Sequence, residues 1–360
     1  MTEHLRQILS QFSMPNLYYV MILSLAMYYL VEKISKNKYL LLKAIRYKGK
    51  QRVHEGEVSR MGGTVIYFCL FFYSYLASKT SFTLSLQVTL ACLLPMMLTT
   101  VKEDLTHNVD IRIRFLALTL SSILLLALAN IELPTVEHIA LISNLFENPV
   151  FSFAFFALCL VSLANGCNFI DGMNGLLSFY FLGALMACLQ LTLIVSDTFL
   201  AKPLVIYIIM ILFFLLVNFP WGKLFLGDSG AYLIALLVGI WSINFFGTYK
   251  SISSWNAGLI FFYPIAEVTF SVLRKLMQHK SPFKPDRHHL HLKVFDIFNS
   301  ALKKPRLANN LTTVFLAPFY LTPPFLLPLV YDSHLLIFIA LTLLTFIYLI
   351  LNIVIPAKTN

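Results

Sequence analysis

Residues 219–239 read FPWGKLFLGDSGAYLIALLVG, and they place one carboxylate between two apolar segments. The preceding apolar run ends at residue 217, and the next one begins at Ser229. Asp228 therefore lies at the boundary of an apolar helix, next to a glycine that leaves the backbone accessible. Because a charged group is costly inside a bilayer, this pattern predicts a functional carboxylate at a membrane boundary.

The composition of the whole chain is typical of a membrane protein. Of the 360 residues, 58% are hydrophobic and 12% are charged, whereas soluble domains carry about 25% charged residues. The apolar residues fall in runs of roughly twenty, the length that a helix needs to cross a bilayer. We therefore predict an all-α polytopic membrane protein in which residues 1–360 form one domain, without a cleavable signal peptide. The five cysteines lie in or beside apolar runs and form no CxxC pair, as expected of reduced core residues.

About eleven membrane-spanning helices can be placed along the chain. The fifth is short, and the sixth begins with polar residues. We expect the helices near residues 16–32, 62–78, 82–100, 114–130, 151–165, 174–196, 202–217, 229–247, 256–276, 312–330 and 334–356. The two long loops between them are 33–61 and 277–311.

Lysine and arginine are distributed unevenly over the two sides of this predicted bundle. The loops that follow odd-numbered helices, together with the C-terminal tail, hold 23 of the 27. Because such residues collect on the cytoplasmic side of membrane proteins, we expect the N-terminus outside and the C-terminus in the cytoplasm. The net charge of +10 would then line the cytoplasmic face of the membrane. This distribution excludes nucleic acid as the expected partner.

Five polar stretches interrupt the alternation of apolar helix and plain loop. By the helix count, each joins an odd-numbered helix to the next even-numbered one, so all five lie on the cytoplasmic side. They therefore predict one composite active site that faces the cytosol. The stretches are HEGEVSRMGG (54–63), VKEDLTHNVDIRIR (101–114), NGCNFIDGMNG (165–175), NFPWGKLFLGDSG (218–230) and SPFKPDRHHLHLKVFD (281–296).

The carboxylates in these stretches are suited to a divalent cation. Glu103 and Asp104 are adjacent at a membrane boundary, and Asp171 and Asp228 each stand beside a glycine. Carboxylates near a low-dielectric region are costly unless they are paired or bind a cation. Mg²⁺ takes one or two carboxylates and completes its shell with water and substrate phosphates. Asp228 also begins a predicted helix, whose exposed amides and dipole favour an anion such as phosphate.

The last long loop gathers imidazoles and cations within ten residues. They are His288, His289 and His291 with Lys284, Arg287 and Lys293. Arginine and lysine neutralise phosphate charge, and histidine can donate a hydrogen bond to it. A metal site and a basic clamp on one membrane face favour a diphosphate as one substrate and a lipid as the other.

Ordinary structural roles compete with these assignments. An aspartate at a helix start is commonly an N-cap, an interpretation that suits Asp110 and also applies to Asp228. Adjacent loop carboxylates such as Glu103 and Asp104 are commonly solvated, and a histidine trio can hold zinc. The placement of all five stretches on one side favours a shared site over these separate explanations.

Taken together, the five stretches resemble the polyprenyl-phosphate N-acetylhexosamine-1-phosphate transferase superfamily, from about residue 54 to residue 296 and the flanking helices. NFIDGMNGL resembles the family pattern NxxDGxDGL at Asn168 and Asp171, and FLGDSG resembles FxGDxG at Asp228. Glu103-Asp104 stands where the family has an Asp-Asp pair. PDRHHLHL resembles PDRxHxHH, and GEVSRMGG resembles the Gly-Gly segment that opens the second helix.

The resemblance implies a role for each matching residue. Asp228 and Asp171 would hold Mg²⁺, for which Mn²⁺ could substitute. The catalytic set would be Asp104, Glu103, Asp171, His289 and His291. Asp104, with Glu103 beside it, would position or deprotonate a lipid phosphate. The substrate-binding set would be Asn168, Asn174, Asn218, Phe225, Arg287 and His288, with Phe225 stacked on uracil.

Three positions depart from the family pattern. Glu103 replaces an aspartate, which could change the metal geometry or the base. Asn174 replaces the second aspartate of its motif, so the preferred sugar could differ from N-acetylglucosamine. Leu292 replaces the last histidine, which makes a pentapeptide translocase less favoured. The SPF before KPDR is closer to the O-antigen and enterobacterial-antigen branch.

The implied reaction moves a sugar-1-phosphate from a UDP-sugar to undecaprenyl phosphate and releases UMP, in the bacterial inner membrane, with a homodimer left open. It would initiate O-antigen or another cell-envelope polysaccharide. Two alternatives remain: the phospho-MurNAc-pentapeptide transferase of peptidoglycan synthesis, and a secondary transporter of a different class. A transporter predicts inverted repeats and polar groups at mid-membrane, whereas this sequence has its polar groups at one face. A membrane metalloprotease is disfavoured because the chain has no HExxH motif.

Overall fold

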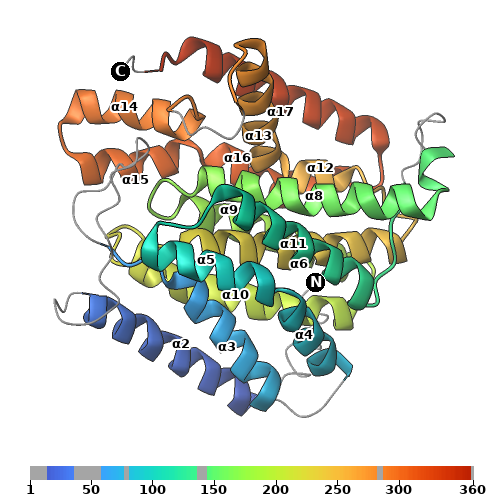
Figure 1. The fold of residues 1–360 in the computed structure, drawn as a ribbon. Helices are drawn as coiled ribbons and strands as arrows, with labels where there is room; N and C mark the ends of the chain where they lie inside the picture. The colour runs from blue at the N-terminus through green and yellow to red at the C-terminus, as the bar shows by residue number, and fades with distance from the viewer. Residues whose placement is uncertain (1–13, 36–57, 77–80, 136–143, 282–286, 358–360) are drawn as a thin grey trace.

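A computed structural model describes residues 14–35, 58–76, 81–135, 144–281 and 287–357. Within these ranges the chain is helical and has no strands, which confirms the all-α prediction. The helices pack as one bundle in Figure 1. They are α2 (Met14–Ser35), α3 (Gly62–Leu76), α4 (Ser81–Cys92), α5 (Leu94–Thr106), α6 (Ile111–Leu128), α8 (Pro149–Ile170), α9 (Leu176–Ile194), α10 (Thr198–Asn218), α11 (Gly227–Thr248), α12 (Asn256–Ile260), α13 (Phe262–Met277), α14 (Leu290–Leu302), α15 (Pro305–Phe315), α16 (Ala317–Val330) and α17 (His334–Val354).

The helices are long and apolar enough for a protein that crosses a membrane several times. Seven segments in the described part of the chain meet this criterion: α6, α8, α9, α10, α11, the combined segment Pro305–Val330, and α17. An eighth results if α4 and α5 form one bent span. These spans do not confirm the eleven predicted. The segment Met21–Val31 within α2 and the helix Gly62–Leu76 are shorter than this criterion requires, and the predicted span near 256–276 is divided between α12 and α13.

Several predicted helices are broken where the sequence contains proline. The predicted span 82–100 divides at Leu93 into α4 and α5, which meet at 55°, with Pro95 in the first turn of α5. The span near 312–330 likewise divides at Leu316, just before Pro318. Proline lacks a backbone N–H and fits best in the first turn of a helix. A helix begins at each of these two prolines, whereas α10 contains Pro203 and α16 contains Pro323, Pro324 and Pro328 in its interior.

Two boundaries differ from the prediction in ways that shape the site. The fifth predicted helix, expected to be short, continues to Ile170, so Asp171 stands directly at its C-terminus. The predicted loop 277–311 contains α14 and the start of α15. Lys284 and Asp286, and residues 54–57 of the first polar stretch, lie outside the described residues.

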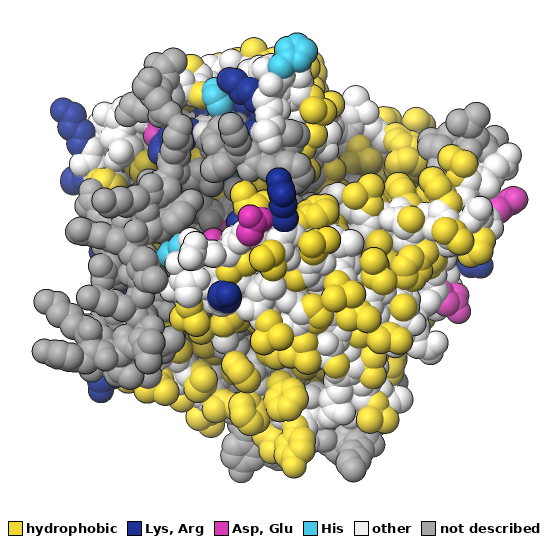
Figure 2. Space-filling view, in the orientation of Figure 1, with side chains coloured by type: hydrophobic (Ala, Val, Ile, Leu, Met, Phe, Trp, Pro, Cys, Tyr) yellow, Lys and Arg dark blue, Asp and Glu magenta, His cyan; other side chains and the backbone are white. Residues whose placement is uncertain are grey.

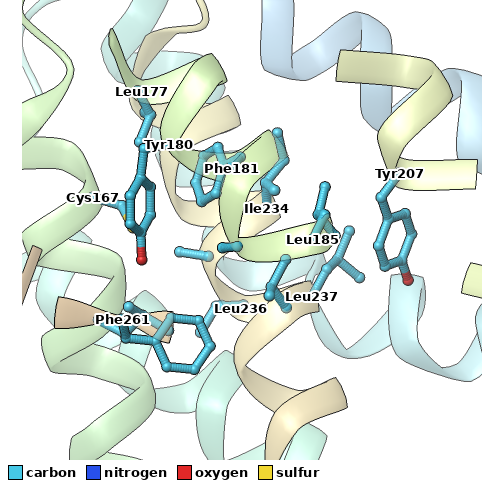
Figure 3. Close-up of a cluster of buried hydrophobic side chains, with 14 of the residues drawn as sticks. Cys167, Leu177, Tyr180, Phe181, Leu185, Tyr207, Ile234, Leu236, Leu237 and Phe261 are labelled. Carbon is cyan, nitrogen blue, oxygen red and sulfur yellow. The ribbon is translucent and has the colours of Figure 1, made fainter. Parts of the chain in front are cut away.

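Helix α11 is the centre of the bundle and carries Asp228 at its start. All of its residues are buried except Asn244 and Thr248. Figure 3 shows part of the surrounding core, where Phe181 of α9 lies beside Ile234 of α11 and Tyr180 of α9 lies beside Cys167 of α8. Burying one helix completely requires neighbours on every side, so α11 provides a rigid support for the residues at its N-terminus.

The outer helices expose broad apolar surfaces. Only 28% of the apolar window of α6, and the same share of α17, is buried inside the protein. In Figure 2 hydrophobic side chains cover most of the middle of this face, and charged and histidine side chains lie mainly toward its upper left. An exposed apolar surface of this extent is the expected contact with lipid tails. This surface supports the prediction of a multi-span membrane protein.

Candidate active site

Two backbone segments far apart in sequence are joined beside the start of α11. The amide of Phe225 donates to the carbonyl of Ser59 (2.9 Å), and the amide of Gly62 donates to the carbonyl of Phe225 (3.0 Å). The amide of Gly63 donates to Leu226 (2.8 Å). A Cβ at Gly63 would overlap the backbone of Gly230, so glycine is required for α3 to lie this close to α11. The first and fourth polar stretches therefore meet.

Asp104, at the end of α5, holds the N-terminus of α11. Its Oδ1 accepts from the amide of Asp228 and its Oδ2 from the amide of Ser229, both at 2.9 Å. The residue before α11, Leu226, provides no side-chain cap, so a carboxylate from another helix satisfies these exposed amides. Asp104 is only 4% exposed. This contact brings the predicted acids Asp104 and Asp228 together.

The carboxylate of Asp228 is held between two guanidinium groups. Arg60 Nη2 donates to Oδ1 and Arg114 Nη1 donates to Oδ2, each at 2.5 Å. The side chain of Asn168, at the end of α8, also hydrogen-bonds Asp228. Three of the five polar stretches thus supply donors to one carboxylate. Charge-assisted hydrogen bonds of this kind are about twice as strong as neutral ones.

Arg60 links three of the predicted acids. Its Nε lies 3.5 Å from Oδ1 of Asp104, in addition to its bond with Asp228. Burial alone would lower the pKa of Arg60, but the negative charges of Asp228, Asp104 and Asp171 raise it above its usual value. Arg60 is therefore the cation that balances this group of carboxylates.

Asp171, which follows the last residue of α8, is a buried acid whose charge Arg60 compensates only in part. Burial raises its pKa to about 7; Arg60 opposes this rise and Asp228 adds to it. A carboxyl group with such a pKa gains strongly from a bound cation, because the cation stabilises its ionised form. A carboxyl group with a raised pKa is typical of a functional site, here one that would bind an anionic substrate.

Glu103 contributes to the fold of the loop after α5. Its Oε2 accepts from the amide of Val109 at 2.9 Å, and its Oε1 lies 3.8 Å from Arg114 Nη1. Glu103 thus orders the segment that carries Arg114 to Asp228. Asp110, by contrast, is the N-cap of α6, as its position in the sequence predicts, and accepts from the amide of Arg112.

Asn174 is buried in an amide network and is 2% exposed. Its backbone amide donates to Asn309 Oδ1 (2.7 Å), and its side-chain amide donates to Asn310 Oδ1 (3.2 Å) and to the carbonyl of Pro220 (3.4 Å). Thr313 donates to the carbonyl of Asn174 (2.7 Å). Helix α15 therefore fixes the loop between α8 and α9, and the side chain of Asn174 serves this packing.

Asn218 performs a similar task at the end of α10. Its Oδ1 accepts from the amide of Gly175 (2.7 Å), and its Nδ2 donates to the carbonyl of Leu224 (2.8 Å). The side chain thereby ties the third polar stretch to the fourth. Phe225, the next residue after Leu224, is half-buried beside Asp228 and is joined to Ser59 through its backbone.

The histidine loop is held by a residue that the sequence analysis did not select. Glu267, in the middle of α13, accepts from Nδ1 of His289 through Oε2 (3.0 Å) and from the amide of Leu290 through Oε1 (3.0 Å). Both side chains are buried. The only signal in the sequence is one carboxylate inside the otherwise apolar stretch FYPIAEVTF.

The two buried imidazoles lie against the loop that carries Asp171. The rings of His289 and His291 are nearly parallel with centroids 5.7 Å apart, and His289 also contacts the ring of Phe169 at 5.2 Å. A Cβ at Gly172 would lie 2.7 Å from Nε2 of His291, so this glycine leaves room for the imidazole. Burial lowers the pKa of His291 to about 3. His291 is thus a neutral group at ordinary pH.

Arg287 and His288 stand at the edge of the same loop. Arg287 Nη2 donates to Oδ1 of Asp296 (2.8 Å), and its side chain is 20% exposed. His288 is half-buried. These two predicted substrate-binding residues therefore adjoin the histidine pair in the sequence.

The donor set of the site fits a hard divalent cation. Asp228 and Asp171 offer oxygen ligands only, and the raised pKa of Asp171 marks a carboxyl that lacks full charge compensation. In the described part of the chain, no three acidic, histidine or cysteine side chains lie together as a ready-made metal site. Mg²⁺ does not require such a cage, because it takes one or two carboxylates and retains water or substrate oxygens.

Sequence reasoning missed Arg60, Arg114 and Glu267. Both arginines lie inside stretches that the analysis selected, SRMGG and DIRIR, but were treated as topological charge. A sequence does not show which of many basic residues reaches a buried carboxylate. The network that joins Asn309 and Asn310 to Asn174 had no signal beyond an Asn-Asn pair in an amphipathic helix.

The protein family described as glycosyl transferase family 4 matches residues 86–246 of this chain. This segment includes the acids of α5, the Asp171 loop and the start of α11. The chain is similar to this family over that segment. The match supports the resemblance for the three polar stretches that lie within it, 101–114, 165–175 and 218–230. The names of the relatives given below share a polyprenyl phosphate.

Three relatives have names that state an activity. The chain is 32% identical over 137 residues to the undecaprenyl-phosphate alpha-N-acetylglucosaminyl 1-phosphate transferase of Thermotoga maritima, covering 38% of this chain and 41% of the relative. It is 22% identical over 273 residues to the probable undecaprenyl-phosphate N-acetylglucosaminyl 1-phosphate transferase of Bacillus subtilis, covering 75% of each. It is 30% identical over 160 residues to the decaprenyl-phosphate N-acetylglucosaminephosphotransferase of Mycobacterium leprae, covering 39% of this chain and 40% of the relative. The chain therefore spans about two fifths of the first and third of these relatives.

Proposed function

We propose that this protein transfers an N-acetylhexosamine-1-phosphate from a UDP-sugar to a polyprenyl phosphate such as undecaprenyl phosphate. The observation that carries the proposal is the cluster of Asp228, Arg60, Arg114 and Asp104 at the buried start of α11. A cluster of acids and guanidinium groups is suited to hold a diphosphate and a cation. The names of the relatives point to the same class of reaction.

In the proposed reaction, an oxygen of the lipid phosphate attacks the β-phosphorus of the UDP-sugar. The bond between this phosphorus and the bridging oxygen breaks, and UMP leaves with that oxygen. The products are a polyprenyl-diphosphate-sugar and UMP. Phosphoryl transfer requires mainly positioning and charge neutralisation from the protein. Both are available from the described residues.

Asp228 and Asp171 would hold Mg²⁺, which neutralises charge on the diphosphate when bound. Arg60 and Arg114 would then be free to turn from Asp228 toward phosphate oxygens, for which the guanidinium fork is suited. The amides at the start of α11 add partial positive charge at the same point. Arg60 and Arg114 would therefore balance the charge of the acids before the substrate binds and the charge of its phosphates afterwards.

Asp104 has a geometry that favours positioning over proton abstraction. Both of its oxygens already accept backbone hydrogen bonds from α11. Proton transfer would have to compete with these bonds. We therefore assign Asp104 the task of holding Asp228 in place. His289 and His291 would contact the substrate from the side of the Asp171 loop.

The orientation of the site follows from the charge distribution. The N-terminus would lie outside, and the site and the C-terminus would lie on the cytoplasmic side of the bacterial inner membrane. The pathway would be O-antigen synthesis or another cell-envelope polysaccharide. N-acetylglucosamine is the sugar in the names of the relatives, and it is the first candidate for the donor.

The decisive experiment measures UMP release from purified protein in detergent with undecaprenyl phosphate and a panel of UDP-sugars. We expect UMP and a lipid-linked sugar with at least one UDP-N-acetylhexosamine, loss of both with EDTA, and recovery with Mg²⁺ or Mn²⁺. No UMP with any UDP-sugar would exclude the proposed donor class. Release that is insensitive to EDTA would exclude the metal assignment.

A further inference from the structure

Glu267 is a buried carboxylate that touches no other acid of the site and has no assigned role. It is 1% exposed, on a helix whose neighbouring positions are apolar. A carboxylate in such surroundings is costly unless its oxygens are satisfied. Both are: Oε1 accepts from the amide of Leu290 and Oε2 contacts Nδ1 of His289, each at 3.0 Å. These two partners are adjacent residues of the histidine loop, and the side chains of Tyr263 and Tyr348 also interact with the carboxylate of Glu267.

These two bonds determine both the place and the rotation of one imidazole. His289 is the residue before α14 and provides no side-chain cap to that helix. Glu267 replaces the missing cap by accepting from Leu290, which fixes the backbone at the start of α14. The bond to Nδ1 then fixes the ring about its own side-chain torsions. A single cap would need only the first of these bonds.

The same contact determines which ring nitrogen carries the proton. The amide of Leu290 can only donate, so Oε1 is an acceptor. Between Oε2 and Nδ1 the proton belongs on the imidazole, because a carboxylic acid is ordinarily about two pKa units stronger than an imidazolium. Nδ1 of His289 therefore donates to Glu267, and Nε2 is left for a partner at the opposite edge of the ring.

The fixed ring lies at the loop that carries Asp171. His289 contacts Phe169 and stacks on His291, and His291 occupies the space beside Gly172. The pair of imidazoles therefore lies against Phe169, through His289, and against Gly172, through His291, and these two residues precede and follow Asp171 in the sequence. A hydrogen bond from this ring would reach the substrate from the same side as Asp171.

The geometry points to Glu267 as the positioning residue for His289: it orients the ring and keeps the proton on Nδ1, so that Nε2 faces the phosphorylated substrate. This assignment rests on the proposed transferase function. Glu267 itself does not touch the substrate; it acts through His289. Carboxylate–histidine pairs of this kind orient functional imidazoles at metal and hydrolytic sites, where loss of the carboxylate reduces activity about 10- to 100-fold or more.

The critical variant is Glu267→Gln. The glutamine oxygen can still accept from Leu290, so the cap is retained, but its NH₂ group donates to Nδ1 of His289 and moves the ring proton to Nε2. We expect kcat to fall about 10- to 100-fold with KM for the UDP-sugar changed less than about threefold. Ser271→Ala is the matched control, because Ser271 is buried one turn further along α13 and its Oγ has no hydrogen-bond partner among the described residues. This control should retain wild-type kcat and thermal stability.

A double-mutant cycle separates positioning from general support of the fold. If Glu267 acts through His289, the Glu267→Gln/His289→Gln double variant loses no more activity than His289→Gln alone. A multiplicative loss would overturn the assignment, as would a Glu267→Gln variant with wild-type kcat. Glu267 would be assigned to stability alone if kcat fell only in proportion to Tm. In that case Glu267→Asp would show the same relation between its kcat and its Tm.

A second readout does not depend on the reaction. In protein labelled with ¹⁵N-histidine, the His289 signal, identified by its absence in His289→Gln, should show the proton on Nδ1 and should change to the Nε2–H form in Glu267→Gln. A wild-type signal with the proton on Nε2 would overturn the inference even if the enzyme is active. If the wild-type protein transferred no sugar from any UDP-sugar, the proposed function would be contradicted. The ¹⁵N spectrum would still test the Glu267–His289 pair.

Discussion

Arg60 and Asp228 are 168 positions apart in the sequence, and the guanidinium of the first binds the carboxylate of the second at 2.5 Å. This pair joins the segment before α3 to the start of the central helix. It also occupies the oxygen that a bound cation would use. Arg60 and a bound cation would therefore compete for the carboxylate of Asp228.

Replacing Arg60 by glutamine should make the protein more dependent on Mg²⁺. Without Arg60 the acids Asp104, Asp171 and Asp228 have one fewer cation, and the loss of a charge-assisted bond should cost about 1.5–3 kcal/mol of stability. Mg²⁺ should raise the Tm of this variant more than the Tm of the wild type, since it no longer competes with Arg60. Transferase activity should fall roughly 100-fold, because a cation for the phosphates is lost.

Arg112→Gln is the control for this experiment. Arg112 is exposed, and only its backbone contacts Asp110. It changes the net charge of the same membrane face by the same amount. A shift in Mg²⁺ response equal to that of Arg60→Gln would show that overall charge, rather than the contact with Asp228, is responsible.

Asp228→Asn should remove activity and also weaken the fold slightly. An asparagine oxygen can accept from one of the two arginines, but its NH₂ group cannot accept from the other. We expect turnover to fall by roughly 100-fold or more, with a Tm below that of the wild type. Asp197→Asn is a matched change at the start of α10, where the carboxylate accepts from the amide of Leu200 and from Tyr249. It should lower Tm with little effect on turnover, and equal losses of turnover in both variants would refute a special role for Asp228.

Gly63→Ala tests the close approach of α3 and α11. An added methyl would overlap the backbone of Gly230, which cannot move without shifting the helix that carries Asp228. We expect a loss of about 1–3 kcal/mol in stability together with reduced activity. At Gly258 the nearest atom to an added Cβ is a leucine methyl at 3.3 Å, which can move aside. Gly258→Ala should therefore be tolerated, and equal stability of the two variants would contradict the packing described for Gly63.

The sequence predicted the all-α architecture and most of the apolar helices. Hydrophobic runs reveal such helices, because a span must be apolar over its whole length. Helix α14 and the start of α15 lie in the predicted loop 277–311 and were not predicted. The five polar stretches meet because each ends or begins a helix at one end of the bundle. The breaks at Leu93 and Phe261 were not predicted, since an apolar run looks the same whether its helix is straight or bent.

The individual partners within the site could not be predicted in the same way. Asp104 was selected as a catalytic group, and its contacts with the amides of Asp228 and Ser229 depend on how α5 meets α11. Asn174 was selected as a substrate contact, and the structure places its side chain in a buried network with Asn310. Residue types indicate chemistry, but tertiary packing decides which donor meets which acceptor.

Asn174→Asp, which restores the residue of the family motif, should destabilise this chain. An ionised aspartate cannot donate to the carbonyl of Pro220 or to Oδ1 of Asn310, so two buried acceptors would face a negative charge. We expect a loss of about 1–3 kcal/mol, measured by thermal unfolding in detergent. Asn310→Asp alone should be costly for a similar reason, since Asn310 Nδ2 also donates to Pro220. An Asn174→Asp variant as stable as the wild type would mean that the network rearranges around a charge.

The final prediction concerns pH. Burial lowers the pKa of His291 to about 3, below the value of 6.5 that applies to the unfolded chain. Between these values the unfolded chain holds a proton that the folded protein does not, so this contribution to stability is complete above about pH 6.5 and is lost as the pH falls toward 3. His291→Gln should therefore lose less stability than the wild type on acidification over this range. His279→Gln, at an exposed position just after α13, should follow the wild-type curve. Thermal unfolding of the three proteins at each pH measures the difference, and parallel curves for His291→Gln and the wild type would show that His291 does not contribute to the acid sensitivity.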